Sequence, residues 1–343
     1  MENWIKADSE QNDIVLSSRI RLARNLEKIP FPDKLETEKA KEIVKQVEDA
    51  FYVNLNNKEK YKTVYLLNED NISNNTFLEK HLVSPKLISN ASKSASAFIL
   101  NKDETVSIMI NEEDHLRIQC ITAGLNLEEA FKEANGLDDM LEQKLNYAFH
   151  EKLGYLTACP TNLGTGLRAS IMIHLPALVM ENEIDQVLSA ISHLGMTIRG
   201  IYGEGSKSEG NLFQISNQIT LGISEKEIVA NLIAIIKQII NQENMARDRI
   251  IKKYRYEIED KIYRALGILR SAVLLDSKEC LKLLSYVRMG VEMGIITDVN
   301  KKILNDLLVS IQPAILQKNS KINLSQRERD LNRAKLVKEK LRI

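Results

Sequence analysis

Residues 111–117, with the sequence NEEDHLR, place three consecutive carboxylates between two runs of alternating apolar residues. Alternation of this kind is typical of β-strands, so the carboxylates are expected at a connection between two strands. By residue type alone, the stretch could be a solvated turn, a metal-binding cage or a device for acid–base chemistry.

Arginines recur at alternating positions in other strand-like segments. Arg19 and Arg21 share one face of their segment, and Arg117 and Arg168 each stand among apolar strand neighbours. Guanidinium groups form bidentate hydrogen bonds to phosphate and stay charged at any relevant pH. Each arginine alone is better explained by a surface position or a salt bridge, but together the four are compatible with a polyphosphate site that needs no glycine loop.

Two glycine-rich segments resemble nucleotide-binding loops but lack the required context. Residues 164–169 (GTGLRA) match the dinucleotide fingerprint, yet the residues that follow alternate like a strand instead of opening a helix. Residues 200–207 (GIYGEGSK) resemble a P-loop whose lysine stands one place late. We therefore reject both a Rossmann site and a P-loop.

Five motifs in order resemble those of the phosphagen (ATP:guanidino) kinases, which move a phosphoryl group between ATP and a guanidinium. The motifs are SSRIR (17–21), NEEDHLR (111–117), CPTNLGTGLRAS (159–170), RGIYGE (199–204), and SN (216–217) followed by LG (221–222). The resemblance implies an α+β catalytic domain in which a mostly antiparallel sheet is flanked by helices.

Two further features are similar to the bacterial protein-arginine kinases. Only 16 residues precede SSRIR, whereas creatine and arginine kinases carry a whole helical domain there, which encloses a small free substrate. The chain also ends in a helical region with RDLNRA at 329–334, similar to the R-D-x-x-R-A motif of that family. We expect a kinase for arginine side chains within proteins; the alternatives are a free-arginine phosphagen kinase and a non-catalytic phosphoarginine-binding adaptor.

The resemblance implies roles for the residues around the guanidinium. Glu113 is expected to receive the guanidinium and act as base, and Glu204 to grip its other side. The task suits carboxylates because a guanidinium, with a pKa above ~12, arrives charged and must lose a proton as the N–P bond forms. Cys159 is expected beside the cation as a tuning thiolate and not as a nucleophile, against the alternative of an inert buried thiol. Glu112 and Asp114 are expected to shape the loop or the magnesium shell.

The resemblance also implies an ATP site with Mg²⁺ held mainly by the nucleotide and not by a protein cage. The five histidines and three cysteines show no metal-ligand spacing, so no protein-held metal is expected. The residues expected to bind ATP are Ser17, Ser18, Arg19, Ile20, Arg21, His81, Arg117, Arg168, Ala169, Ser170, Ile171, Met172, Arg199, Gly200, Ile201, Tyr202, Gly203 and Glu204.

The last motif is expected to bind phosphoarginine as an allosteric and partner-recognition site. Arg329 and Arg333 stand at i and i+4, so they share a helix face and are expected to clamp one phosphate. Asp330 would orient Arg333 or meet the ligand's guanidinium, and Ala334 completes the motif. The alternative is an ordinary charged helix face exposed to solvent.

Composition restricts the class of protein. A chain of 343 residues with 44% hydrophobic and 27% charged residues is typical of a soluble globular protein with one large or two ordinary domains. Zero formal net charge gives no global signal for nucleic acid or an acidic membrane surface. Three widely spaced cysteines and no signal-peptide pattern favour the reducing cytoplasm.

The elements that must position these residues follow from periodicity. Strands are expected at 14–22, 63–67, 94–100, 105–110, 116–121, 168–175 and 211–216. Helices are expected at 36–52, 127–134, 138–152, 185–193, 257–275, 278–293 and 299–311, with capping boxes at Ser224/Glu227 and Ser325/Glu328 opening two more. We therefore expect a catalytic domain at 1–250 and an all-helical domain at 251–343.

The resemblance finally implies partners that the residues alone do not indicate. These are protein substrates with exposed arginines, a second copy of the chain in a homodimer, a zinc-binding activator, a heat-shock transcriptional repressor and a Clp ATPase. The expected setting is stress response and protein quality control, without direct contact to nucleic acid or membrane.

Overall fold

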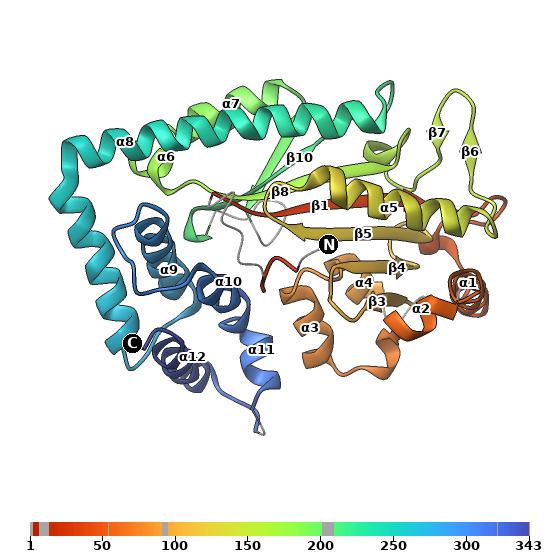
Figure 1. The fold of residues 1–343 in the computed structure, drawn as a ribbon. Helices are drawn as coiled ribbons and strands as arrows, with labels where there is room; N and C mark the ends of the chain where they lie inside the picture. Colours follow the sequence, from red (N-terminus) through yellow and green to blue (C-terminus); the bar gives the residue numbers. More distant parts are fainter. Residues whose placement is uncertain are drawn as a thin grey trace. The chain divides into compact units, whose positions relative to one another are not determined.

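The computed structural model describes residues 3–6, 14–53, 55–90, 95–200, 209–320 and 322–342. Eight strands form one sheet in the order β2-β3-β4-β5-β1-β8-β10-β9, and β6 and β7 form a separate hairpin (Figure 1). The pairs from β2 to β5 are antiparallel. The strands are β1 (Val15–Arg24), β2 (Tyr61–Tyr65), β3 (Ala97–Asn101), β4 (Val106–Ile110), β5 (Leu116–Ala123), β6 (Phe149–His150), β7 (Gly154–Tyr155), β8 (Leu167–His174), β9 (Met196–Gly200) and β10 (Leu212–Asn217).

Helices flank the sheet and dominate the last part of the chain, which confirms the predicted fold class. They are α1 (Thr37–Phe51), α2 (Leu55–Lys60), α3 (Asn71–Glu79), α4 (Pro85–Asn90), α5 (Leu127–Glu142), α6 (Pro176–Met180), α7 (Ile184–His193), α8 (Glu225–Ser271), α9 (Ser277–Glu292), α10 (Lys301–Ser310), α11 (Pro313–Lys318) and α12 (Gln326–Lys340). None of the described helices is both long and apolar enough to cross a bilayer.

The chain divides into two compact units. The first comprises Met1–Asn3, Ser18–Ser170 and Asn217–Leu232, and the second comprises Trp4–Ser17, Ile171–Ser216 and Ile233–Ile343. The boundary predicted at residue 250 lies inside α8, close to Tyr254, whose φ of −135° and ψ of 41° interrupt the helix.

Strand pairing determines where the acidic stretch lies. Ile110 of β4 pairs with Leu116 of β5, so residues 111–115 form the connection between the two strands. In the same register Met109 lies opposite Arg117, and Phe98 of β3 lies opposite Met109. Directly opposite residues share a face of the sheet, so Arg117 projects from the same face as these two apolar side chains.

The turn between α3 and α4 packs on this face of the sheet. A buried apolar cluster joins the turn to the strands; its members are Val64, Leu66, Leu82, Val83, Leu87, Phe98, Leu100 and Met109. Phe77 of α3 meets Phe98 edge-on with the ring centroids 5.0 Å apart. Burial of apolar area, at roughly 25 cal/mol per Å², holds Leu82 and Val83 of this turn against β2, β3 and β4.

Helix α5 packs against β5 on the other side (Figure 1). The Ser18 hydroxyl of β1 donates to the Gly124 carbonyl at 2.7 Å and accepts from the Asn126 amide at 2.9 Å, at the start of this helix. Because side chains alternate along a strand, the even-numbered residues of β1 point towards α5, and Arg19 and Arg21 point to the opposite face.

One secondary-structure prediction is wrong in part. Of the helix expected at 138–152 only residues 138–142 are helical, as the end of α5, which runs through Gly136 to Glu142 before the chain turns. The amide of Ala148 donates to the Asn25 carbonyl, and the carbonyl of Asn146 accepts from Glu27, so pairing with the end of β1 replaces helical hydrogen bonds there. Strand β9 was not predicted from the sequence.

The second unit contains a bundle in which α10 packs against α9, α11 and α12 (Figure 1). Both capping boxes are confirmed. Ser325 accepts from the Glu328 amide while Glu328 accepts from Ser325, and Ser224 and Glu227 exchange the same bonds at the start of α8.

Candidate active site

Four arginines converge on one face of the sheet in the first unit. Arg19 and Arg21 come from β1, Arg117 from β5 and Arg168 from β8, and Arg19 Nε donates to Ser170 Oγ at 3.3 Å. Desolvation, together with the charges of Arg117 and Arg168, lowers the pKa of Arg19 to about 9. The pKa of Arg21 is lowered further by desolvation and by all three neighbouring guanidinium groups. Such an accumulation of positive charge is suited to a polyanion, because an anion would relieve the repulsion.

Glu112 is the carboxylate bound to this cluster. Its Oε1 lies 2.6 Å from Arg117 Nη1 and also accepts from the Ser84 hydroxyl. Burial alone would raise the pKa of Glu112, but Arg117 and Ser84 lower it, so the side chain is a buried carboxylate. Glu112 therefore orients Arg117 and balances one of the four positive charges.

His81 lies at the edge of the arginine cluster. Its backbone has a φ of 60°, and its carbonyl accepts from Gln119 Nε2 at 2.9 Å. Desolvation and the charge of Arg19 lower the pKa of the imidazole to about 4, so the ring is neutral near pH 7. A neutral imidazole beside buried arginines can hydrogen-bond to a nucleotide without adding to the repulsion.

Glu113 is the most exposed of the three carboxylates in the acidic stretch. It is half-buried, and desolvation together with the neighbouring charges of Glu112 and Asp114 raises its pKa. A raised pKa makes the carboxylate a better proton acceptor. The backbone of the connection is held by hydrogen bonds from the Asn111 amide to the His115 carbonyl and from the Glu112 amide to the Asp114 carbonyl.

Asp114 and His115 are buried and committed to the fold. Asp114 Oδ1 accepts from Asn25 Nδ2 and from the Ala158 amide. His115 Nδ1 accepts from the Leu26 amide, so its Nε2–H donates to the Pro30 carbonyl. Among the residues that the structure describes, no group of three His, Cys, Asp or Glu could hold a metal ion.

Cys159 lies in a loop that backbone and side-chain bonds restrain. The thiol lies 3.0 Å from Thr161 Oγ1, and the Cys159 carbonyl accepts from Thr157 Oγ1. Thr220 donates to the carbonyls of Thr161 and Leu163. The thiol is partly exposed, which does not fit an inert core cysteine such as Cys120 or Cys280.

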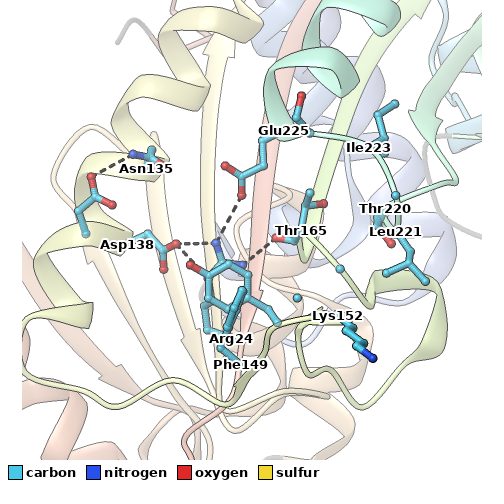
Figure 2. Close-up of a pocket in the computed structure, with 16 residues that line it drawn as sticks. Arg24, Asn135, Asp138, Phe149, Lys152, Thr165, Thr220, Leu221, Ile223 and Glu225 are labelled. Atoms are coloured by element: carbon cyan, nitrogen blue, oxygen red, sulfur yellow. Dashed lines mark hydrogen bonds and ion pairs between the residues drawn. The ribbon is translucent and has the colours of Figure 1, made fainter.

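A cavity of about 430 Å³ is lined in part by Gly164 and Thr165, which follow this loop. Figure 2 shows Arg24 in its wall, with bonds to Asp138, Glu225 and the Thr165 carbonyl. The Arg24 guanidinium also lies 3.5 Å from the centre of the Tyr155 ring. Arg24 is therefore neutralised by carboxylates, one from α5 and one from the start of α8.

Several predicted nucleotide-binding residues do not turn their side chains to the arginine face. Ser18 bonds to the start of α5, and Ile20, Ala169 and Ile171 are fully buried at the positions that alternate with the arginines. For these four, only the backbone is available to a ligand on the arginine face. Ser17 and Met172, by contrast, stand at strand positions in register with Arg19 and Arg168.

The remaining predicted residues of this site belong to the second unit or lie outside the described part. Arg199 and Gly200 are the last two residues of β9. Ile201, Tyr202, Gly203 and Glu204 lie outside the described residues. The contribution of this motif stays a prediction.

The RDLNRA motif lies in α12, but its two arginines are not equivalent. Arg333 is 1% exposed, and its guanidinium donates to the carbonyls of Ile311 and Leu275 and to Asp330 Oδ1. Arg329 is only partly buried and donates to the Leu324 carbonyl. Arg333 is thus bonded within the fold, whereas Arg329 is partly exposed, and the clamping of one phosphate by the pair stays a prediction. Ala334 is fully buried beside it.

Comparison with known proteins places this geometry in a family. The profile described as ATP:guanido phosphotransferase, C-terminal catalytic domain, matches residues 42–246, and the Protein-arginine kinase McsB C-terminal domain matches residues 255–343. Curated relatives named Protein-arginine kinase from Clostridium kluyveri and Bacillus subtilis are 60% and 46% identical to it over 100% of this chain, and over 99% and 94% of their own lengths. The chain belongs to the protein-arginine kinase family.

Solved structures agree with the fold of this kinase. The crystal structure of lombricine kinase is 27% identical with a TM-score of 0.59, covering 69% of this chain and 68% of its own. A duplicated taurocyamine kinase from Schistosoma mansoni, solved with transition-state analog components, is 22% identical with a TM-score of 0.62 over 79% of this chain and 41% of its own. The kinase is thus a phosphotransferase with the phosphagen-kinase fold.

Three residues that support the site were not singled out from the sequence of the kinase. Gln119 holds the His81 backbone, Ser84 bonds to Glu112, and Asn25 bonds to Asp114. Gln119 shares its strand face with Arg117, and that period-two relation is a signal that could have found it. Ser84 and Asn25 stand in other segments, and only the fold brings them to the acidic stretch.

Proposed function

We propose that this protein transfers the γ-phosphoryl group of ATP to arginine side chains of proteins. The observation that carries the proposal is the pairing of Glu113, a half-buried carboxylate of raised pKa, with a cluster of arginines whose pKa values desolvation and mutual repulsion lower. The Glu113 carboxylate suits a guanidinium, and the arginine cluster suits a polyphosphate. The names of the relatives supply the acceptor, an arginine within a protein.

Arg19, Arg21, Arg117 and Arg168 are the residues proposed to hold the nucleotide phosphates, with Arg199 and His81 as further contacts. Support comes from Arg21, whose Nε is buried without a hydrogen-bond partner among the described residues. A phosphate oxygen would satisfy this donor. Mg²⁺ is proposed to enter with the nucleotide and to neutralise its charge there.

Glu113 is the proposed base, and Glu204 and Cys159 the proposed neighbours of the guanidinium. As a guanidinium nitrogen attacks the γ-phosphorus, an N–P bond forms and the bond to the β-phosphate oxygen breaks, releasing ADP. The proton displaced from that nitrogen passes to the Glu113 carboxylate. Orientation and charge complementarity are the main contributions expected of a protein in such a transfer.

The test is incubation of the protein with γ-labelled ATP and either a basic protein or free arginine. We expect acid-labile label on the protein substrate, and mass spectrometry should locate it on arginine. Label on free arginine alone would instead indicate a free-arginine kinase, and phosphoarginine binding without any transfer would indicate an adaptor.

The region around Arg329 and Asp330 is the proposed phosphoarginine-binding site of α12. Arg329→Ala is expected to weaken phosphoarginine binding by about 10- to 100-fold, because one charge-assisted hydrogen bond contributes about 1.5–3 kcal/mol. Isothermal titration calorimetry with phosphoarginine measures the change. Arg327→Ala, which removes an exposed arginine of the same helix, is the control that should bind normally; equal binding by all three proteins contradicts the site.

The wider role is proposed from the family resemblance. It includes marking proteins for Clp-type degradation, control of a heat-shock repressor, activation by a zinc-binding protein, and a cytoplasmic setting. A homodimer is also proposed, and Tyr256, Tyr263 and Val273, which are 80%, 53% and 69% exposed, offer apolar surface for it.

A further inference from the structure

Asn25 uses its whole side chain to join the end of β1 to two other segments. It is 1% exposed. Its Oδ1 accepts from the His115 amide at 2.9 Å, and its Nδ2 donates to Asp114 Oδ1 at 2.6 Å and to the Leu156 carbonyl at 2.9 Å. A buried carboxamide whose bonds tie separate segments together acts as a cross-link, since losing any of these bonds leaves a buried polar group unpaired.

Asp114 extends the cross-link to the cysteine loop. It is 2% exposed, and the same Oδ1 that accepts from Asn25 accepts from the Ala158 amide at 2.7 Å. Glu113 directly precedes Asp114, and Cys159 directly follows Ala158. The hydrogen bond from the Ala158 amide to Asp114 Oδ1 therefore joins the direct sequence neighbours of Glu113 and Cys159, two of the proposed guanidinium contacts.

The acidic connection needs this support. Asn111 enters it with a φ of 58°, a conformation that residues other than glycine adopt rarely. Its side chain donates to the Ala40 carbonyl, and its carbonyl accepts from Ser96, so the start of the connection is held from one side. The end of the connection is held from the other side by Asn25, which leaves Glu113 between two restrained points.

We propose that Asn25 is a positioning residue that acts through Asp114 to set the Glu113 carboxylate against the Cys159 loop. The proposal rests on the proposed function, in which these two side chains flank the guanidinium. The physical reason is that in-line transfer tolerates little displacement: a misplacement of about 1 Å can cost ~10²-fold in rate. The nucleotide phosphates are held by other residues, so ATP binding does not depend on Asn25.

Asn25→Asp tests the proposal with almost no change in size. The new carboxylate has no hydrogen to donate and faces both Asp114 Oδ1 and the Leu156 carbonyl, so the cross-link opens. We expect kcat for protein arginine to fall about 100-fold, while KM for ATP stays at the wild-type value.

Asn74→Asp is the matched control. Asn74 is likewise buried in the first unit, and its Nδ2 donates to the Leu66 carbonyl, away from the catalytic loops. This variant should lose stability in urea titrations but keep the kcat of the folded protein. If Asn25→Asp does not fold, the neutral Asn25→Ser provides the same loss of Nδ2 and should show the same fall in kcat.

The outcomes separate the two proposals. A wild-type protein that transfers no phosphate to protein arginine overturns the proposed function. An active wild type with Asn25 variants that keep full kcat overturns the positioning role. So does a KM for ATP that changes as much as kcat, since that result would indicate general structural damage.

Discussion

Glu113→Gln is expected to lower kcat for arginine phosphorylation by about 10²- to 10⁴-fold, the range that general base catalysis contributes. The amide has the size of the carboxylate but neither its charge nor a proton-accepting oxygen of comparable basicity. Stopped assays of phosphoarginine formation measure the loss. Nucleotide affinity should be unchanged, because Glu112, and not Glu113, is the carboxylate that binds Arg117. A variant with wild-type kcat would contradict the proposed base.

The pH dependence provides a second readout for Glu113. Its pKa is raised above the ordinary value of 4.5 by desolvation and by the charges of Glu112 and Asp114. A base must be deprotonated, so activity is lost as pH falls through this raised pKa, and the acidic limb of kcat/KM should lie above pH 4.5. Asp114→Asn removes one of the like charges and should move that limb to lower pH. A limb that stays in place or moves upward would show that another group controls it.

Arg21→Gln is expected to weaken ATP binding by about 10- to 100-fold, which corresponds to one lost charge-assisted hydrogen bond of about 1.5–3 kcal/mol. Removing a buried side chain usually lowers the free energy of unfolding, but Arg21→Gln should not lower it in the nucleotide-free protein. The pKa of Arg21 is lowered by desolvation and by repulsion from Arg19, Arg117 and Arg168. Removing its charge relieves that repulsion, so the free energy of unfolding without ATP should stay the same or rise.

Arg24→Met is the matched control for Arg21→Gln, because both arginines belong to β1. Arg24 is 1% exposed, and its Nη2 lies 2.6 Å from Asp138 Oδ2, so its removal leaves a buried carboxylate unpaired. We expect a loss of about 3–5 kcal/mol in the free energy of unfolding, with no change in ATP affinity for the folded protein. Urea titrations and calorimetry with ATP measure both quantities. Equal destabilisation by the two variants would contradict a functional accumulation of charge around Arg21.

The two arginines of β1 illustrate how far the sequence supports prediction. Alternation correctly separates Arg19 and Arg21 from Ile20 and Leu22, because side-chain direction in a strand is a local property. The same pattern does not reveal that Arg24 is neutralised, since Asp138 stands more than a hundred residues away in α5. Local periodicity predicts the face of a side chain but not its partner.

The helix expected at 138–152, which ends at Glu142, and the two arginines of α12 show a related limit of local patterns. Spacing at i and i+4 does place Arg329 and Arg333 on one helix, but burial of Arg333 depends on carbonyls of Leu275 and Ile311 from other segments. Likewise, the backbone after Glu142 pairs with the end of β1 instead of continuing α5. In both cases, hydrogen bonds to distant segments decided where the residues lie, and the local sequence pattern did not predict those bonds.

The acidic stretch shows what each level of structure decided. The sequence by itself determined that carboxylates follow a strand and that an arginine stands four residues after Glu113, because chain order and strand alternation are enough for that. Only the tertiary structure distinguished the three acids: Glu112 meets Arg117 and Ser84, Asp114 meets Asn25 and Ala158, and Glu113 stays half-buried with a raised pKa. Adjacent residues of one type acquire different chemistry because desolvation and neighbouring charges are set by segments that meet only when the chain folds.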